Sequence, residues 1–158
     1  DAMYEDHWLQ MMRKKLGLLG EKAEDKSLIN DLLLLMQQNK ADYTNTFCLL
    51  MKKDLQKDIL LKNQTFIDWY KRWKKRLKQN NNKLESYINL MQSTNPLIIP
   101  RNHKVEEALN AATANNDLVP FHNLLKVLKK PYKNHSEIAD YQSPPLPSDK
   151  AYKTFCGT

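Results

Sequence analysis

The sequence predicts an all-α fold of about six or seven helices, followed by an extended, proline-rich C-terminal tail. Apolar residues recur at intervals of three and four along most of the chain, and no segment shows the sustained alternation of a strand. From residue 131 onward prolines and polar residues dominate, including SPPLP at 143–147, which is typical of an extended tail. We therefore divide the 158 residues into a helical domain, 1–131, and a tail, 132–158.

The first two expected helices fill the N-terminal part of the chain. The apolar face of the first consists of Trp8, Met11, Met12 and Leu16. Gly17 or Gly20 can terminate it, because glycine accepts the left-handed conformation that often follows a helix. Asp25 or Ser27 can cap the second helix. Its apolar run at 32–36 is wider than one stripe, which predicts that neighbouring helices cover it on more than one side.

Three further helices are expected before residue 95, and the fourth has the strongest pattern. Asp42 is a plausible N-cap of the third helix. Because the aromatic residues of the fourth helix fall at core spacing, we expect them to pack inside the fold rather than stack on bases. The inner faces are Phe47, Leu50 and Met51 in the third helix, Phe66, Trp69, Tyr70, Trp73 and Leu77 in the fourth, and Leu84, Tyr87, Ile88 and Met91 in the fifth.

The last two expected helices span the region after residue 101. Small residues on the sixth favour close packing, and its apolar face is Val105, Ala108, Leu109 and Ala112. Asp117 is a natural N-cap of the seventh, and Pro120 fits its first turn, where the missing N–H costs nothing. Lys129 and Lys130 suit the negative C-terminal end of the seventh helix, and Pro131 stops it.

The connection NPLIIPRNH, residues 95–103, is predicted to be a structural clamp. Asn95 precedes a proline and should close the fifth helix, while Pro96 and Pro100 stiffen the connection and residues 97–99 plug the core. Asn102 can cap the next helix. Arg101, a cation at a helix N-terminus, needs a carboxylate or carbonyl partner. A second interpretation is that this clamp positions a neighbouring domain. The residues proposed for it are Asn95, Pro96, Arg101 and Asn102.

The excess positive charge of the chain is concentrated in one region. Residues 52–83 hold eleven Lys or Arg against three Asp, whereas the net charge of the whole chain is +7. The pattern of the fourth expected helix favours a solvated basic face opposite a core face. A charged docking surface is the alternative. Nucleic-acid binding is a weaker alternative, because no recognised nucleic-acid-binding module accompanies the basic residues. The candidate docking residues are Lys71, Arg72, Lys74, Lys75, Arg76 and Lys78.

Composition excludes several kinds of site. With three glycines the chain cannot form a phosphate-binding loop, and GxGxxG, Walker and HExxH motifs are absent. Its four histidines are scattered, so we expect no metal site. No apolar run reaches 18 residues, so we expect no transmembrane helix and no membrane partner. Two cysteines fit a reducing, cytoplasmic compartment. Cys48 is expected to be an inert helix residue, whereas Cys156 lies near the end of the tail, where it either serves redox chemistry or has no role.

Taken together, these segments resemble the C-terminal part of the SelO (YdiU) family, which comprises pseudokinase-fold protein adenylyltransferases. The matching phrases are MMRKKLGL at 11–18, ADYTNTF at 41–47, MQSTNPLIIPRN at 91–102, LKVLKKPY at 125–132 and the closing DYQSPPLPSDKAYKTFCGT. They occur in the family's order and span most of the chain, and only residues 52–90 resemble the family loosely. Because the chain also starts at Asp1, without an initiator Met or a signal-peptide pattern, we expect it to be a fragment of a longer protein.

The resemblance implies a parent protein that moves AMP from ATP to Ser, Thr or Tyr hydroxyls of protein substrates. It implies that ATP and Mg or Mn are held by a kinase-like region N-terminal to this chain. That region would be the partner of this chain, a helical domain without catalytic activity of its own. It also implies that Cys156 is the family's terminal redox-type cysteine. Some members of the family end in a Cys-x-x-selenocysteine pair, and the second residue of that pair would be residue 159, beyond this chain. The alternative is a free-standing basic helical module that binds an acidic protein or nucleic acid.

Overall fold

The computed structural model describes residues 2–52, 63–79, 84–134 and 138–145, and within these ranges it contains eight helices and no strand. The all-α prediction is therefore confirmed. The helices are α1 (Ala2–Lys15), α2 (Asp25–Gln38), α3 (Tyr43–Leu50), α4 (Gln64–Lys78), α5 (Leu84–Thr94), α6 (Asn102–Asn115), α7 (Val119–Leu128) and α8 (Ile138–Gln142). Within the ranges described, no helix has the length and apolarity to cross a membrane.

The helix count differs from the sequence prediction because α8 lies where an extended tail was expected. That prediction is wrong for residues 138–142, which form a short helix with Ile138 buried. Short helices are held mainly by tertiary packing, and Ile138 packs against α6 and α7, a contact that local composition does not reveal. The remainder of the predicted tail, from residue 146 onward, lies outside the described residues.

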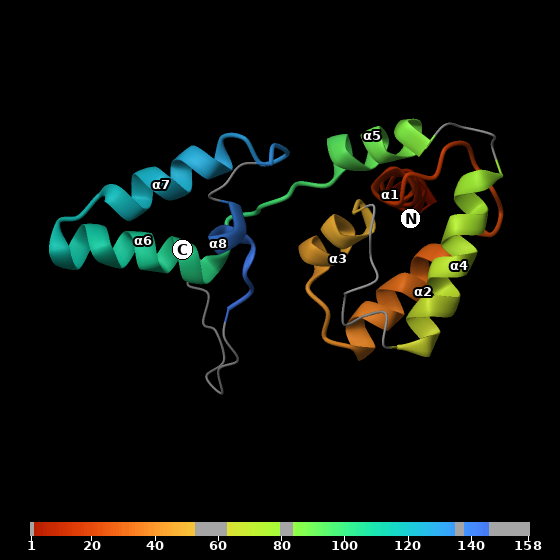
Figure 1. The fold of residues 1–158 in the computed structure, drawn as a ribbon, viewed down its shortest axis with the longest axis horizontal. Helices are drawn as coiled ribbons and strands as arrows, with labels where there is room; N and C mark the ends of the chain where they lie inside the picture. The colour runs from red at the N-terminus through yellow and green to blue at the C-terminus, as the bar shows by residue number, and fades with distance from the viewer. Residues whose placement is uncertain (1, 53–62, 80–83, 135–137, 146–158) are drawn as a thin grey trace.

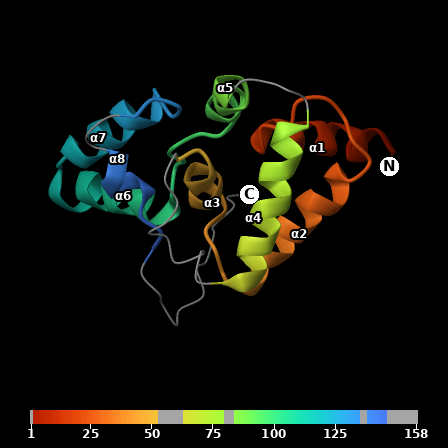
Figure 2. The same cartoon turned by 45° about the vertical axis from the view of Figure 1, so that its right-hand side comes forward.

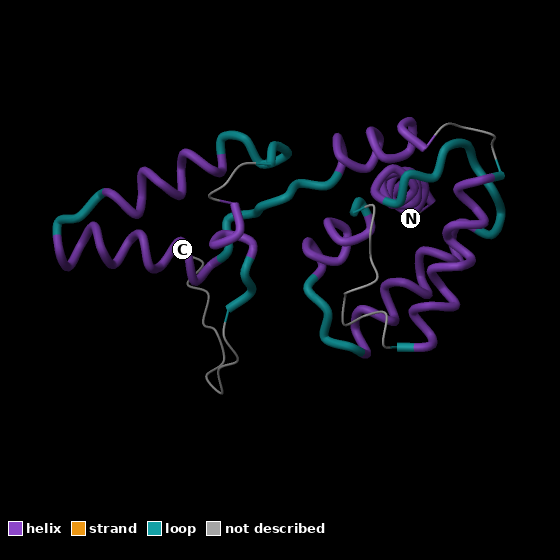
Figure 3. The backbone as a smooth tube through the Cα atoms, viewed as in Figure 1, coloured by secondary structure: helices purple, strands orange, loops and turns teal. Residues whose placement is uncertain are grey.

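The eight helices form two groups, each with its own hydrophobic cluster (Figure 1). The first group, α1–α5, is built around α2 packed on α4 and α1 packed on α2 and α5. The second group is the antiparallel pair α6 and α7 together with α8, and its cluster consists of Ile98, Ala108, Leu124, Val127 and Ile138. The tube drawing follows the loop at 95–101 as it joins the groups (Figure 3), and a second view shows α6 and α7 projecting from the first group (Figure 2).

The predicted termination of the first helix at Gly17 is confirmed. Gly17 has φ +68°, the left-handed conformation. The Leu18 amide donates to the Arg13 carbonyl at 2.9 Å and the Gly17 amide donates to the Lys14 carbonyl at 3.1 Å, which is the Schellman pattern of a helix end. A Cβ at Gly17 would lie 3.0 Å from Cγ of Met91 and from the Tyr87 carbonyl oxygen. Glycine is therefore required here both for its conformation and for the close approach of α5.

The fourth helix contributes its aromatic side chains to the core, as predicted. Trp69 and Trp73 are almost fully buried, and their rings stack with centroids 5.9 Å apart. Each indole N–H also has a partner: Trp69 donates to the Leu28 carbonyl at 2.8 Å and Trp73 donates to the Leu16 carbonyl at 2.9 Å. These two bonds tie α4 to α2 and to the end of α1, so the aromatics serve packing.

The second helix departs from the prediction at its first turn. Asp25 is not an N-terminal cap: the cap position is Glu24, and the Asp25 side chain is fully buried between two arginines. The apolar run at 32–36 is covered on more than one side, as predicted, because α2 packs on both α1 and α4 and Leu32 is fully buried; Leu34 is 53% exposed. The run extends the apolar face beyond the area that the first group covers.

Candidate functional site at the junction of the helical groups

Arg101 makes the central contact between the two helical groups. It precedes α6, and its guanidinium donates to Asp42 through two bonds, Nη1 to Oδ2 at 2.8 Å and Nη2 to Oδ1 at 3.0 Å. Nη2 also approaches Oδ1 of Asn45 at 3.3 Å. The arginine side chain is 7% exposed and the aspartate 25%. This is the carboxylate partner that the sequence required for Arg101, and the two-pronged geometry fixes α6 relative to α3.

Asp42 performs two tasks at once. As predicted, it caps α3, since its Oδ1 accepts from the Asn45 amide at 2.8 Å. The hydrogen bond from Arg101 holds the pKa of Asp42 below its ordinary value; burial opposes this, and the Asn45 amide supports it. Asp42 is therefore ionised at neutral pH and committed to structural partners. It does not serve as a general base, which would need a pKa near the operating pH.

The other residues of the predicted clamp divide between structural contacts and the surface. Asn95 closes α5, its amide donating to the Met91 carbonyl at 2.8 Å, and its side chain donates to the Lys15 carbonyl at 2.8 Å. The carbonyl of Pro96 accepts from the Cys48 thiol at 3.5 Å. Asn102 is not a cap: it is the first residue of α6 and is exposed, and Arg101 occupies the cap position without a side-chain cap bond.

The short helix α8 completes the junction. Its last residue, Gln142, donates from Nε2 to the Leu97 carbonyl at 2.9 Å and accepts from Nδ2 of Asn45 at 3.0 Å through its own carbonyl. The Leu97 amide in turn donates to the Pro131 carbonyl at 2.7 Å. Of the apolar triplet 97–99, Ile98 alone is fully buried, and Ile99 is exposed, contrary to the prediction that all three plug the core.

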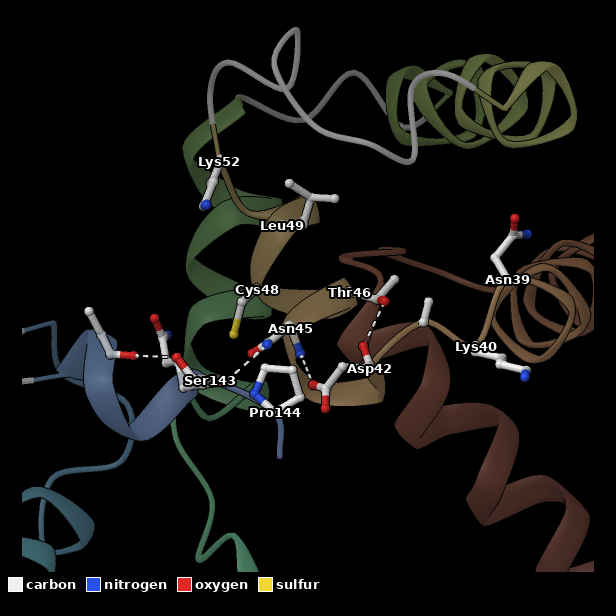
Figure 4. A pocket seen from close by; sticks show the side chains of 13 residues that line it. Asn39, Lys40, Asp42, Asn45, Thr46, Cys48, Leu49, Lys52, Ser143 and Pro144 are labelled. Carbon is white, nitrogen blue, oxygen red and sulfur yellow. Dashed lines mark hydrogen bonds between the residues drawn. The ribbon is translucent and has the colours of Figure 1, made fainter. Parts of the chain in front are cut away.

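A cavity of about 520 Å³ lies between α3 and α8 at this junction (Figure 4). A second cavity of about 460 Å³ shares Cys48, Lys52 and Gln142 with the first. The wall of the first mixes polar and apolar groups, and it consists of Asn39, Lys40, Ala41, Asp42, Asn45, Thr46, Cys48, Leu49, Lys52, Ala139, Gln142, Ser143 and Pro144. Among these lining residues there is no histidine to act as a base and the only carboxylate is engaged by Arg101, so the cavity holds no assembled acid–base pair.

Cys48 is a protonated thiol at this site. It is half-buried, and burial, followed by the nearby Asp42 carboxylate, raises the pKa of Cys48 above its ordinary value, although Lys52, Lys15 and Arg101 oppose the shift. Because the thiolate is the nucleophilic form, this cysteine is a poor nucleophile at neutral pH. Cys156, the candidate redox residue, lies outside the described residues.

The basic face of α4 is smaller than the sequence indicated. Arg76 does not belong to a docking surface: it is 3% exposed, and its Nε donates to Asp25 at 2.7 Å. Arg13 donates to the same carboxylate at 2.9 Å, and Arg76 also donates to the Gly20 carbonyl at 3.0 Å. This buried network could not be predicted from the sequence, because an aspartate before an apolar helix is typical of an ordinary cap and no local signal separates the two roles.

The remaining basic residues of α4 include several with partners of their own. Arg72 pairs with Asp31 at 2.7 Å, and Lys71 pairs with Asp68 at 3.3 Å. Lys74 lies over the rings of Tyr70 and Trp73, and burial lowers the pKa of Lys74. Lys75 and Lys78 are exposed. The described part of the chain contains no group of three His, Cys, Asp or Glu side chains that could hold a metal ion.

Comparison with known proteins gives consistent matches. The sequence model of the SelO family, described as protein adenylyltransferase SelO, matches residues 1–129. The chain is 46% identical over 157 residues to the protein nucleotidyltransferase YdiU of Nitrosococcus oceani and 49% identical over 155 residues to that of Pelagibacter ubique. A Bacillus cereus YdiU is 44% identical over 157 residues. These matches cover 98–99% of this chain but 32% of each relative, so the chain spans about a third of their length.

Proposed function

The chain belongs to the SelO family, and from this premise we propose that it is the C-terminal helical part of a longer protein adenylyltransferase of pseudokinase fold. The longer protein transfers AMP from ATP to Ser, Thr or Tyr hydroxyls of other proteins in the cytoplasm. The observation that carries this proposal is the match to YdiU nucleotidyltransferases along nearly the whole chain, combined with its span of about a third of their length.

The part played by these residues is structural support of the kinase-like region. ATP and Mg or Mn do not fit the described residues. The least exposed of the ion-paired carboxylates, Asp25 and Asp42, are each held by arginine, and no three metal-binding side chains of the described residues converge. Mg²⁺ sites in nucleotide enzymes are built from one or two free carboxylates and substrate phosphates. We derive no catalytic step from this chain; ATP and metal belong to the kinase-like region.

The alternative, a free-standing basic module, has less support. Nucleic-acid and acidic-protein binding both need clustered, accessible cations. On α4, Arg76 is buried in an ion pair and Arg72 is engaged by Asp31. Lys75 and Lys78 are exposed and have no carboxylate partner among the described residues. Two unpaired lysines on one helix are fewer cations than a surface that binds nucleic acid normally presents. We retain this exposed face as a candidate docking surface for an acidic protein.

The redox role of Cys156 remains part of the proposal. We propose that this thiol forms a disulfide with a cysteine of the kinase-like region when an oxidant such as hydrogen peroxide removes two electrons and two protons from the pair. Cys48 is an unsuitable partner because it is half-buried on α3 with a raised pKa. Mass spectrometry of non-reduced peptides from the oxidised longer protein tests this, and a Cys48–Cys156 peptide would contradict it.

The proposed activity is tested by comparing two proteins under the same conditions. The longer protein and the 158-residue chain are each incubated with ATP, Mg or Mn and a protein mixture, and modified peptides are identified by mass spectrometry. We expect AMP on Ser, Thr or Tyr with the longer protein and none with the chain alone. Transfer of phosphate instead of AMP by the longer protein, or AMP transfer by the chain alone, would overturn the proposal.

A further inference from the structure

The second helical group has an apolar surface that none of the described residues covers. Five of its large hydrophobic side chains are 39% or more exposed, and all lie between residues 109 and 125: Leu109, Leu118, Val119, Phe121 and Leu125. The cluster that holds this group together is small, with five buried residues. Singly exposed apolar side chains are ordinary, whereas a set of them on one small element marks an interaction surface.

Three of these side chains form a stripe along α7 and the turn that precedes it. Leu118, Phe121 and Leu125 are spaced at three and four residues, so they lie on one side of the helix, and they are 52%, 40% and 39% exposed. The buried residues of the same helix, Leu124 and Val127, face α6 and α8. Because successive residues are about 100° apart, the stripe borders the buried face directly. The apolar side of α7 is therefore wider than the part that α6 and α8 cover, and the stripe is the part left exposed.

Charge on α7 and on the turn that follows it restricts the kind of partner. Between residues 118 and 134 the sequence contains four lysines and no acidic residue, and Lys129, Lys130 and Lys133 are exposed at the C-terminal end of the stripe. Two copies of this chain, each with a net charge of +7, would repel each other on pairing through the stripe, and a parallel pairing would also place these lysines side by side. A partner with an apolar groove edged by Asp or Glu would instead be complementary in shape and in charge.

We infer that the stripe formed by Leu118, Phe121 and Leu125 is the surface that docks this chain onto the remainder of its own longer protein, in an apolar groove edged by acidic side chains. The inference rests on the proposed function, because the occupant is the region that this chain, with 32% of the length of its relatives, does not span. Figures 1 and 2 show α6 and α7 projecting from the first helical group.

The test measures the accessibility of single cysteines on α7 in two proteins. Leu118→Cys and Leu125→Cys report on the stripe, and Asn123→Cys, an exposed position on the opposite side of the same helix, is the matched control. Each substitution is made in the 158-residue chain and in the longer protein. The rate of reaction with a thiol reagent is read peptide by peptide, so that Cys48 and Cys156 do not interfere.

If the inference holds, Leu118→Cys and Leu125→Cys react at least about tenfold more slowly in the longer protein than in the chain, because covered sites react through transient opening. Asn123→Cys should react at similar rates in both. Equal rates at the stripe in both proteins would overturn the inference. If the stripe cysteines of the 158-residue chain alone react more slowly as the chain concentration rises, the stripe is a self-association surface instead. If they react more slowly only when phosphatidylserine vesicles are present, the stripe binds a membrane surface.

A second pair of variants guards against misfolding of the cysteine forms. Leu125→Asp places a carboxylate against the expected acidic edge, whereas Leu125→Met keeps the stripe apolar. In the longer protein, limited proteolysis should release the second helical group faster in Leu125→Asp than in Leu125→Met, and identical release would contradict the docking surface. These measurements need no ATP, so a protein that protects the stripe but transfers no AMP would contradict the proposed function alone.

Discussion

Replacing Arg101 with alanine should destabilise the fold by about 1–3 kcal/mol. The substitution removes both hydrogen bonds from the guanidinium to Asp42, at 2.8 and 3.0 Å, and the contact to Asn45. What is left at the junction is a carboxylate whose remaining donor is the Asn45 amide. The two helical groups would then be held together by the bonds of Gln142 and the loop at 95–101.

The magnitude follows from the environment of the pair. Hydrogen bonds to charged groups contribute about 1.5–3 kcal/mol each, so two bonds set an upper bound of about 3–6 kcal/mol. Asp42 is 25% exposed, so water can replace part of the lost donation. The Nε of Arg101 is buried without a hydrogen-bond partner among the described residues, a cost that the substitution removes. Both corrections lower the net loss to about 1–3 kcal/mol.

The assay is urea unfolding followed by far-ultraviolet circular dichroism and, separately, by tryptophan fluorescence. Trp69 and Trp73 report on the first helical group, so a variant with a weakened junction should also separate the two signals. Lys104→Ala is the matched control, because it breaks an exposed pair with Glu107 on the same helix and should cost less than about 1 kcal/mol. If Arg101→Ala unfolds with the wild-type midpoint, the junction does not hold the groups and our reasoning is refuted.

The stabilisation by Arg101 should also depend on pH in a defined direction. The pKa of Asp42 is lower in the folded chain than in the unfolded one, so the contribution is fully present above the unfolded value, about 3.9. It is lost as the pH falls through the folded pKa. Wild type and Arg101→Ala should therefore converge in stability as the pH is lowered below about 4 and differ most near neutrality. A difference that stays constant over this range would contradict the ion pair.

Three other substitutions and probes test the remaining structure. Asp25→Ala leaves two buried arginines without their carboxylate and should cost about 3–5 kcal/mol in urea unfolding, against about 1 kcal/mol or less for Asp31→Ala at an exposed pair. Gly17→Ala should cost at least about 1–2 kcal/mol, since φ is +68°; Gly20→Ala, at an exposed position with the same φ, should cost less because Gly17 also contacts Met91 closely. Cys48 should react with a thiol reagent at neutral pH more slowly than free cysteine does, and an equal rate would contradict its burial and raised pKa.

Local patterns were sufficient to predict most of the helices. The spacing of Phe66, Trp69 and Trp73 placed them in the core, and Asp42 and Gly17 were recognised as helix boundaries from their residue types alone. Each of these depends on interactions within a few residues, or on the burial of one helix face. The helix α8 was missed because it depends on Ile138 packing against distant helices, and the five-residue segment has no strong pattern of its own.

The partnerships between distant residues could be predicted only in kind. The position of Arg101 at a helix start required an acceptor, but its partner, Asp42, is 59 residues away and is also a helix cap. Arg76 shares a helix with exposed lysines, and its buried bond to Asp25 spans 51 residues. A charged residue on an amphipathic helix can either be exposed to solvent or be buried in an ion pair. Its residue type does not tell which, because it does not specify which helix packs against that side.

We propose above all that this chain supplies structure to a longer adenylyltransferase and contains no nucleotide site of its own. Calorimetric titration of the 158-residue chain with Mg-ATP tests it most directly, with circular dichroism to verify that the helices are formed. The chain should bind no ATP and give no heat beyond dilution, because the described residues include no metal-binding cluster and the sequence no phosphate loop. A saturable heat with a micromolar dissociation constant would contradict the claim.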